Sequence, residues 1–333
     1  MLYQQNSSMK GPSPVEYQMS ISRSAQFWII FPIYIPSVVC SLFDLYHYLI
    51  CRTIRQALHN HVITFLLLIN LIIQLTSIPF TLSYLHLGYV WPQSPTFCIF
   101  WTIIDEGLFI ALTAFFAWAT IERHILIFHD RLVSTRRKII IFHYIPMVIV
   151  FLYCVCYTLI VIVFPPCENT FDYDELTCGE PICYYNEKSL AMWDIIVDHL
   201  IAVLIIVFCS FTLLLRILYQ KSRMRQTTQW KKYRKMTIQL LAISFLYFVI
   251  YIPHMFLEFL HICCIPEEVG ADFMAYSDFF SYYGNLLLPF VCAGSIPDLR
   301  TKVKNMFLLR RRRVARIIYP ETMTLSRRAV VRQ

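Results

Sequence analysis

The sequence has little charge and little glycine. Asp, Glu, Lys and Arg together make up 15% of its 333 residues, and glycine occurs 7 times. A water-soluble domain of this size needs a larger share of charged residues to cover its surface. Hydrophobic residues, in contrast, make up 58% of the chain. The composition excludes an ordinary soluble domain and indicates a membrane protein.

The sequence also lacks the motifs of intramembrane enzymes and of metal sites. It has no His-Glu-x-x-His, no Gly-x-Ser-x-Gly and no paired Gly-Asp motif. His59 and His61 lie close together, but no cysteine or acid follows them at metal-ligand spacing. We therefore expect no enzymatic activity, no metal ion, no cofactor and no nucleic-acid partner.

Seven apolar runs are each long enough to cross a hydrocarbon core of about 30 Å. They lie near residues 27–50, 62–87, 98–128, 139–164, 191–218, 236–263 and 271–293. Strict alternation of polar and apolar residues is absent, which favours helices over a β-barrel. The sequence thus predicts an all-α membrane protein, a bundle of seven transmembrane helices. A transporter is a weaker alternative, because paired repeats with helices broken at corresponding positions are missing.

Basic residues gather in alternate loops of this bundle. The first, third and fifth loops and the tail from Arg300 hold most of them, whereas the second, fourth and sixth loops share Lys188 alone. By the positive-inside rule, the N-terminus is outside the cell and the C-terminus inside. A seven-span channel of the insect odorant type has the opposite orientation, which this asymmetry disfavours.

The third apolar run carries charged residues at both ends. Asp105 and Arg123 are 18 residues apart, which is five turns of an α-helix and about 27 Å along its axis. The stripe between them reads Phe109, Leu112, Phe116 and Ala119. A charge at the bilayer centre costs about 2.5–3.5 kcal/mol and normally faces a bundle interior. The alternative for Arg123 is a side chain that snorkels to the membrane surface.

Several motifs resemble those of rhodopsin-like (class A) G-protein-coupled receptors. The stretch TIERHILIFHDRL resembles the Glu/Asp-Arg-Tyr motif that ends the third helix in that family, with His124 in place of tyrosine. Cys98 matches the family's outer disulfide cysteine, and Trp91 matches the tryptophan of its first outer loop. Further matches are Asn60, Asn70 and Pro79 in the second helix, Tyr251 and Pro253 in the sixth, and Leu288, Pro289 and Cys292 in the seventh.

The chain departs from this family in many positions. The first helix has no asparagine, the fourth no tryptophan and the fifth no proline, and Asn70 stands where the family has aspartate. The resemblance therefore implies a divergent member. Its domains would be an extracellular tail over residues 1–26, a receptor domain over 27–296, an amphipathic eighth helix over 297–313 and a cytoplasmic tail over 314–333. Asn6 begins a glycosylation sequon in the outer tail.

The resemblance also implies a mechanism. In the family, the neighbouring acid holds the motif arginine at rest, and the arginine later faces a cavity for a heterotrimeric G protein. Residues with roles in coupling and activation would be Glu122, Arg123, His124, Asn70, Pro253 and Pro289. The inner end of the sixth helix, WKKYRKMT, has no acid to restrain Arg123. We therefore predict a multi-pass plasma-membrane receptor with ligand-independent signalling.

Cysteines cluster near the predicted outer face, where the redox environment favours disulfides. Cys98 matches the family's outer disulfide cysteine. We expect it to pair with Cys183, which lies closest before the fifth helix, and this leaves Cys167 to pair with Cys178. Cys167 is an alternative partner for Cys98, since sequence does not fix connectivity.

Acidic residues dominate the predicted outer half. Clustered acids repel one another unless a cation is supplied, and their field attracts a positively charged ligand. Candidate ligand-binding residues are Asp105, Glu106, Asp194, Asp198, Tyr251, Glu258 and Asp278. Two of them, Asp194 and Asp198, have a plainer interpretation as acids that favour a helix N-terminus.

Two kinds of cationic ligand fit this pattern. Asp105 occupies the position whose aspartate binds the amine in aminergic receptors of this family, which suggests a small amine. However, the first serine of the fifth helix is Ser210, too far down to bind a catechol, and the loop CENTFDYDELTCGEPICYYNEK is long and acidic. We favour an extended basic peptide and keep the amine as the alternative.

Overall fold

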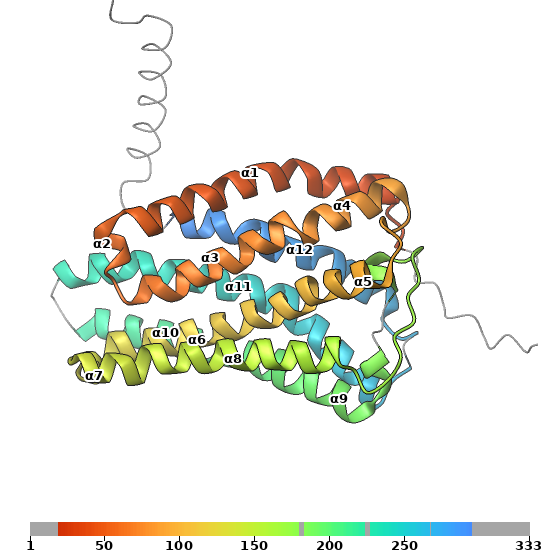
Figure 1. Ribbon diagram of the computed structural model, residues 1–333. Helices are drawn as coiled ribbons and strands as arrows, with labels where there is room; N and C mark the ends of the chain where they lie inside the picture. Colours follow the sequence, from red (N-terminus) through yellow and green to blue (C-terminus); the bar gives the residue numbers. More distant parts are fainter. Residues whose placement is uncertain (1–18, 180–182, 224–226, 267, 295–333) are drawn as a thin grey trace, which may run out of the picture.

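The computed structural model describes residues 19–179, 183–223, 227–266 and 268–294, which form a bundle of long helices (Figure 1). We call each run of consecutive helical segments along the bundle a rod. The first rod is α1 (Arg23–Ile50) with α2 (Arg52–Arg55), and the second is α3 (His59–Leu75) with α4 (Ser77–Leu87). The third consists of α5 (Pro95–Thr102), η1 (Ile103–Gly107) and α6 (Leu108–Phe128). A short η2 (Asp130–Val133) follows the third rod.

Four further rods complete the described bundle. The fourth consists of α7 (Arg136–Ile139), η3 (Ile140–Tyr144), α8 (Ile145–Thr158) and η4 (Leu159–Val163), and the loop after it holds η5 (Leu176–Cys178) and η6 (Cys183–Asn186). The fifth consists of α9 (Lys188–Trp193), η7 (Asp194–Ile201) and α10 (Ala202–Arg223), and the last two are α11 (Thr227–Cys263) and α12 (Ala271–Gly294).

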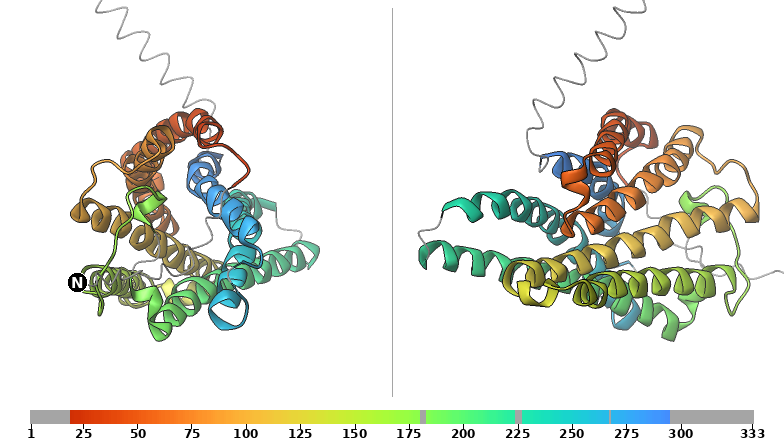
Figure 2. Two further views of the ribbon diagram at one scale, coloured as in Figure 1. Left: turned by 90° about the vertical axis from the view of Figure 1, so that its right-hand side faces the viewer. Right: turned by 60° about the vertical axis from the view of Figure 1, so that its left-hand side comes forward.

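These rods confirm the predicted all-α membrane protein. Among the described residues, the first five rods are long and apolar enough to cross a membrane. The last two, α11 and α12, cover the positions predicted for the sixth and seventh spans. The third rod is central, because α6 packs against α3, α8 and α10, while α1 packs against α3 and α12 (Figure 2).

The two ends of the bundle differ in charge. We call the end that carries α5, α9 and both disulfides the acidic end, and the opposite end, with α2 and α7, the basic end (Figure 1). The acidic end corresponds to the predicted outside. Asn6, the tail over 1–18 and the segments over 297–313 and 314–333 lie outside the described residues, so their roles and the orientation remain predictions.

The second rod is broken between α3 and α4 at Thr76, whose φ is −124° and ψ is −75°. Pro79 has no N–H group, so the backbone cannot form the hydrogen bond that an α-helix needs at this point. Beside this break, the Thr76 hydroxyl donates to the Ile72 carbonyl at 2.6 Å. This break turns Ser77, the first residue of α4, into the bundle, where its side chain is fully buried.

A buried polar clamp joins the first, second and seventh rods. Gln74 of α3 donates from Nε2 to the Ser37 hydroxyl at 2.7 Å and to the Asn285 carbonyl at 3.1 Å. Ser41 donates to Gln74 Oε1 at 2.7 Å, and Ser37 donates to the Leu286 carbonyl at 2.6 Å. The first helix has no asparagine, and two of its serines make these polar contacts with Gln74 of the second rod and with the seventh rod.

The expected disulfide pairing is wrong. Cys98 pairs with Cys178, and Cys167 pairs with Cys183. The loop first crosses to α4, where the Tyr84 hydroxyl donates to the Asp174 carbonyl at 3.0 Å. This crossing brings Cys178 beside α5.

The returning chain then meets the start of the loop. The Cys183 N–H donates to the Asn169 side chain at 3.0 Å, which places Cys183 beside Cys167. Cys183 lies closest before the fifth helix along the chain, but this position did not make it the partner of Cys98. The path of the loop across the bundle decided both pairs.

Candidate functional site

The third rod connects the two ends of the bundle through a buried stripe. Leu112, Phe116 and Ala119 are at most 2% exposed, and Arg123 at the basic end is also 2% exposed. The part of the stripe from Leu112 to Arg123 therefore faces the bundle interior. A snorkelling Arg123 is excluded, because a snorkelling side chain would reach the surface.

At the acidic end, Asp105 lies on the π-helical turn η1. The Ser77 hydroxyl donates to its carboxylate, which ties the third rod to the break in the second rod. Asp105 remains half-buried rather than fully enclosed. Close packing holds this turn, since a Cβ at Gly107 would lie 2.6 Å from Thr158 Cγ2.

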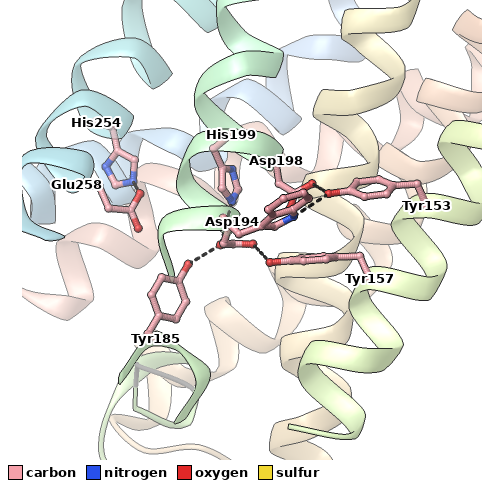
Figure 3. A network of polar contacts seen from close by, with 9 residues as sticks. Tyr153, Tyr157, Tyr185, Asp194, Asp198, His199, His254 and Glu258 are labelled. Carbon is pink, nitrogen blue, oxygen red and sulfur yellow. Dashed lines mark hydrogen bonds and ion pairs between the residues drawn. The ribbon is translucent and has the colours of Figure 1, made fainter. Parts of the chain in front are cut away.

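The carboxylate of Asp194 is surrounded by three donors (Figure 3). The hydroxyl of Tyr157 lies 2.7 Å from Oδ1, the hydroxyl of Tyr185 lies 3.0 Å from Oδ2, and Nε2 of His199 lies 3.5 Å from Oδ2. Asp194 itself is fully buried. Its acceptor positions are used within the protein, so it holds together the fourth rod, the η6 turn and the fifth rod.

A π-helical turn explains why Asp194 and His199 meet. In an α-helix, residues five apart point in different directions, because one turn takes 3.6 residues. The η7 segment has π-helical bonding, in which each N–H reaches the carbonyl five residues earlier. This wider turn returns residue 199 to the face that carries residue 194.

Burial is the main cause of a raised pKa at the two tyrosines of η6. The pKa of Tyr185 is raised well above its ordinary value, first by burial and then by the charges of Tyr184 and Asp194. Burial and the charges of Asp194 and Glu106 likewise raise the pKa of Tyr184. Tyr185 therefore stays protonated and remains a donor to Asp194 at physiological pH.

Asp198, one turn further on, faces the same neighbouring rod. The Tyr153 hydroxyl donates to its Oδ1 at 2.6 Å, and Trp193 Nε1 donates to the Tyr153 oxygen at 3.3 Å (Figure 3). Asp198 is 4% exposed. Like Asp194, it joins the fourth and fifth rods rather than pointing to the surface.

Three aromatic rings lie at the centre of the bundle below these acids. Phe109 stacks on the His199 ring with centroids 5.5 Å apart, and the Tyr251 ring lies 5.2 Å from Phe109. The Tyr251 hydroxyl donates to the Ser281 carbonyl at 3.1 Å. A Cβ at Gly284 would lie 2.7 Å from that hydroxyl, so the close approach requires glycine. These contacts link the third, fifth, sixth and seventh rods.

The sixth and seventh rods each place an acid beside His254. His254 Nδ1 lies 3.3 Å from Asp278 Oδ1, and His254 Nε2 lies 3.9 Å from Glu258 Oε2. The side chain of Asp278 is 61% exposed and that of Glu258 is 23% exposed. Both carboxylates therefore lie beside the same imidazole ring.

The structure divides the predicted ligand residues into two groups. Asp194 and Asp198 serve contacts between rods, whereas Asp105, Glu258 and Asp278 keep exposed surface at the acidic end. Glu106 lies near the η6 tyrosines, and Tyr251 packs in the aromatic centre. Sequence interpretation missed Ser77, Tyr153, Tyr157, Tyr185, His199 and His254. The pair His254 and Glu258, four residues apart, is the signal that could have been found.

At the basic end, Glu122 contacts a histidine of the fourth rod. His143 Nδ1 lies 2.5 Å from Glu122 Oε1, and both side chains are at most 2% exposed. His143 Nε2 lies 3.1 Å from Nδ1 of His61 in α3. His61 Nε2 lies 2.9 Å from the Arg55 carbonyl. None of these histidines was among the predicted site residues.

The other predicted activation residues lie in different environments. His124 Nε2 lies 2.6 Å from the Cys209 carbonyl, and the fifth and sixth rods meet at Ser210 and Ser244, whose hydroxyl oxygens are 2.6 Å apart. Asn70 and Pro289 are buried, whereas Pro253 is exposed on α11. Among the described residues, no hydrogen bond or ion pair links Asn70, Pro253 or Pro289 to Glu122.

Comparison with known families agrees with this arrangement. The family profile described as 7 transmembrane receptor (rhodopsin family) matches residues 45–291, well over half of the chain. A comparison with curated proteins found no match. The matched region runs from the end of the first rod into the seventh, and it includes both ends of the third rod. This chain belongs to the rhodopsin family of seven-transmembrane receptors and is a non-enzymatic, multi-pass membrane protein.

Proposed function

We propose that this receptor binds a cationic ligand at the acidic end and activates a heterotrimeric G protein at the basic end, in the plasma membrane. The observation that carries the proposal is the third rod, with Asp105 half-buried at one end and Arg123 buried at the other. A single rod can transmit a shift between the ends because its packed stripe contacts three other rods.

The ligand-binding residues of this proposal are Asp105, Glu106, Glu258 and Asp278. Asp194 is left out, because three donors already surround its carboxylate. Asp198 is left out because it is 4% exposed. The exposed acids of the loop, Asp172, Asp174 and Glu175, add negative charge near α4.

The spread of these acids favours an extended ligand. Asp278 lies on the seventh rod, Asp105 on the third, and Asp174 above the second. A small amine needs one acid, whereas several exposed acids on separate rods suit a peptide with more than one arginine or lysine. Electrostatic attraction would also speed its association.

The ligand is tested by screening basic and C-terminally amidated peptides, together with small amines, on cells that express the receptor. We expect a basic peptide to activate, and Asp105→Asn and Asp278→Asn each to weaken it by tenfold or more. Asp272→Asn is the matched control, since Asp272 is exposed in the first turn of α12 and belongs to no described ion pair. Activation by an amine that depends on Asp105 and not on Asp278 would favour the amine alternative.

G-protein coupling is tested separately with membranes and purified heterotrimers. We expect nucleotide exchange above that of mock membranes without ligand, because the inner part of the sixth-rod sequence has no acid to restrain Arg123. Arg123→Ala should abolish the exchange. Equal exchange by receptor and mock membranes, with and without an active peptide, would contradict the proposal.

A further inference from the structure

Three sulfur atoms meet at the acidic end, where the fifth and sixth rods contact each other. The thiol of Cys263, the last residue of α11, lies 4.0 Å from the Sδ atom of Met192 in α9. The thiol groups of Cys263 and Cys264 also interact with each other. Two rods thus bring two thiols and one thioether to the same place.

The two thiols of this group are not used in disulfides. Both disulfides of the described residues join other cysteines, and Cys263 and Cys264 are free. The Cys264 N–H donates to the Leu260 carbonyl at 2.8 Å, which continues the helical turn, and the Cys263–Cys264 peptide bond is trans. Cα atoms across a trans peptide are about 3.8 Å apart, closer than the about 4.4–6.8 Å of ordinary disulfides. The helix end therefore holds the two thiols side by side without favouring a bond between them.

The group is open to solvent and lies beside a positive charge. Cys264 is exposed, and Cys263 and Met192 are half-buried. Lys188, the first residue of α9, is exposed, and its charge acts on Cys263. An ion can therefore reach the sulfur atoms from the solvent at the acidic end.

We propose that Cys263, Cys264 and Met192 form a binding site for a soft monovalent metal ion, Cu(I), between the fifth and sixth rods. Thiolate and thioether ligands together select Cu(I), whereas zinc sites use thiolate, imidazole and carboxylate ligands. A zinc–thiolate bond is about 2.3 Å long, so two sulfur atoms that share an ion of similar size are at most about 4.6 Å apart. The 4.0 Å between the Cys263 and Met192 sulfur atoms satisfies this limit.

Binding replaces two protons with one cation. Each thiol releases its proton to water when its sulfur bonds to the metal, and the thioether has no proton to release. Two thiolates and one Cu(I) carry a single net negative charge, which the neighbouring Lys188 offsets. The copper keeps its oxidation state, so the step needs no oxidant or reductant.

The sequence motifs did not reveal this site, because they describe zinc-type ligand sets. Among the residues that the structure describes, no group of three or more His, Cys, Asp or Glu side chains could hold a metal ion. The third ligand here is a methionine, 71 residues from Cys263 along the chain. The packing of α9 against α11 brings it to the cysteines.

An ion at this site would connect the fifth and sixth rods at the acidic end. Because Cu(I) would bind the folded bundle at sulfur atoms that unfolding separates, it should raise the thermal midpoint of the receptor. The inference does not depend on the proposed cationic ligand or on coupling to a G protein.

The site is tested by Cu(I) transfer to the purified full-length receptor in detergent. A coloured Cu(I) chelator supplies the ion, with ascorbate present and oxygen excluded. We expect the wild type to withdraw one Cu(I) per molecule more than the double variant Cys263→Ser/Cys264→Ser. Each single serine variant should also lose this transfer, and Met192→Leu should bind several-fold more weakly.

Two matched controls should behave like the wild type. Cys156→Ala changes an exposed free cysteine of α8, and Met274→Leu changes a half-buried methionine of α12. Equal transfer to the wild type and to the double variant would overturn the site. So would an unchanged affinity in Met192→Leu, because the thioether would then not be a ligand, or displacement of the bound Cu(I) by an equal concentration of Zn²⁺.

A second measurement needs no variant and therefore covers serine variants that fail to fold. The X-ray absorption spectrum of the wild-type receptor loaded with one Cu(I) should show sulfur neighbours alone, and the thermal midpoint should rise on loading. Nitrogen or oxygen neighbours at the copper would contradict the three-sulfur site. A disulfide at Cys263 or Cys264, found by mass spectrometry in receptor taken directly from cells, would contradict it as well.

Discussion

Two buried carboxylates at opposite ends of the bundle are each paired with a histidine, yet their surroundings differ. Asp194 at the acidic end meets three donors, from Tyr157, Tyr185 and His199. Glu122 at the basic end meets His143 through Oε1, while its Oε2 has no hydrogen-bond partner among the described residues. A carboxylate that is held by three donors is fixed, whereas one with a single donor can change partners.

A third carboxylate extends this comparison. Asp44 of α1 is fully buried, and neither of its oxygens has a hydrogen-bond partner within the described part of the chain. The three acids thus have three donors, one donor and none. Burial alone therefore does not decide whether an acid is held in place. The number of hydrogen-bond donors around its carboxylate decides this.

The largest effect is expected for Asp194→Ala. The change leaves two tyrosine hydroxyls and a histidine without their shared acceptor, and breaking a buried pair in this way costs about 3–5 kcal/mol. We expect much less folded receptor at the cell surface and a lower midpoint in a thermal unfolding assay in detergent. Glu122→Gln, measured in parallel, should lose far less stability. Equal losses for the two variants would break the comparison.

A smaller effect of opposite sign is expected for Asp44→Val. Replacing an acid that has no donor with an apolar side chain of similar size removes a desolvation cost of about 1–3 kcal/mol. We therefore expect a higher thermal midpoint. Ser41→Val, on the same helix, should lower it, because Ser41 donates to Gln74. A lower midpoint for Asp44→Val would mean that this acid has a partner that stabilises it.

The smallest effects are expected for single donors of Asp194. Tyr157→Phe and Tyr185→Phe each remove one hydrogen bond and leave two donors, which should cost about 0.5–1.5 kcal/mol apiece. Tyr46→Phe, at a tyrosine that is 55% exposed, is the matched control and should be neutral. The measurement is again the thermal midpoint. If either variant is as damaging as Asp194→Ala, the three donors do not share the role.

Much of the fold was predictable, because apolar length and charge asymmetry act over whole helices. The positions of the rods agree with the seven apolar runs to within several residues, and the buried stripe of α6 lies where helical spacing places it. Two of the predicted ligand-binding residues instead make contacts between rods. The sequence predicts that Asp194 and Asp198 bind ligand or favour a helix N-terminus, but the π-helical turn η7 directs them to the tyrosines of α8.

The sequence by itself determined that this chain is a helical membrane protein with one acidic and one basic end, since these properties depend on composition and on runs of about 20 residues. The tertiary structure alone decided which acids have partners and which cysteines pair. His61, His143 and Glu122 lie far apart along the chain, and so do Cys98 and Cys178. Such contacts depend on how rods pack, on a helix break at Thr76 and on the path of one loop, which no local pattern encodes.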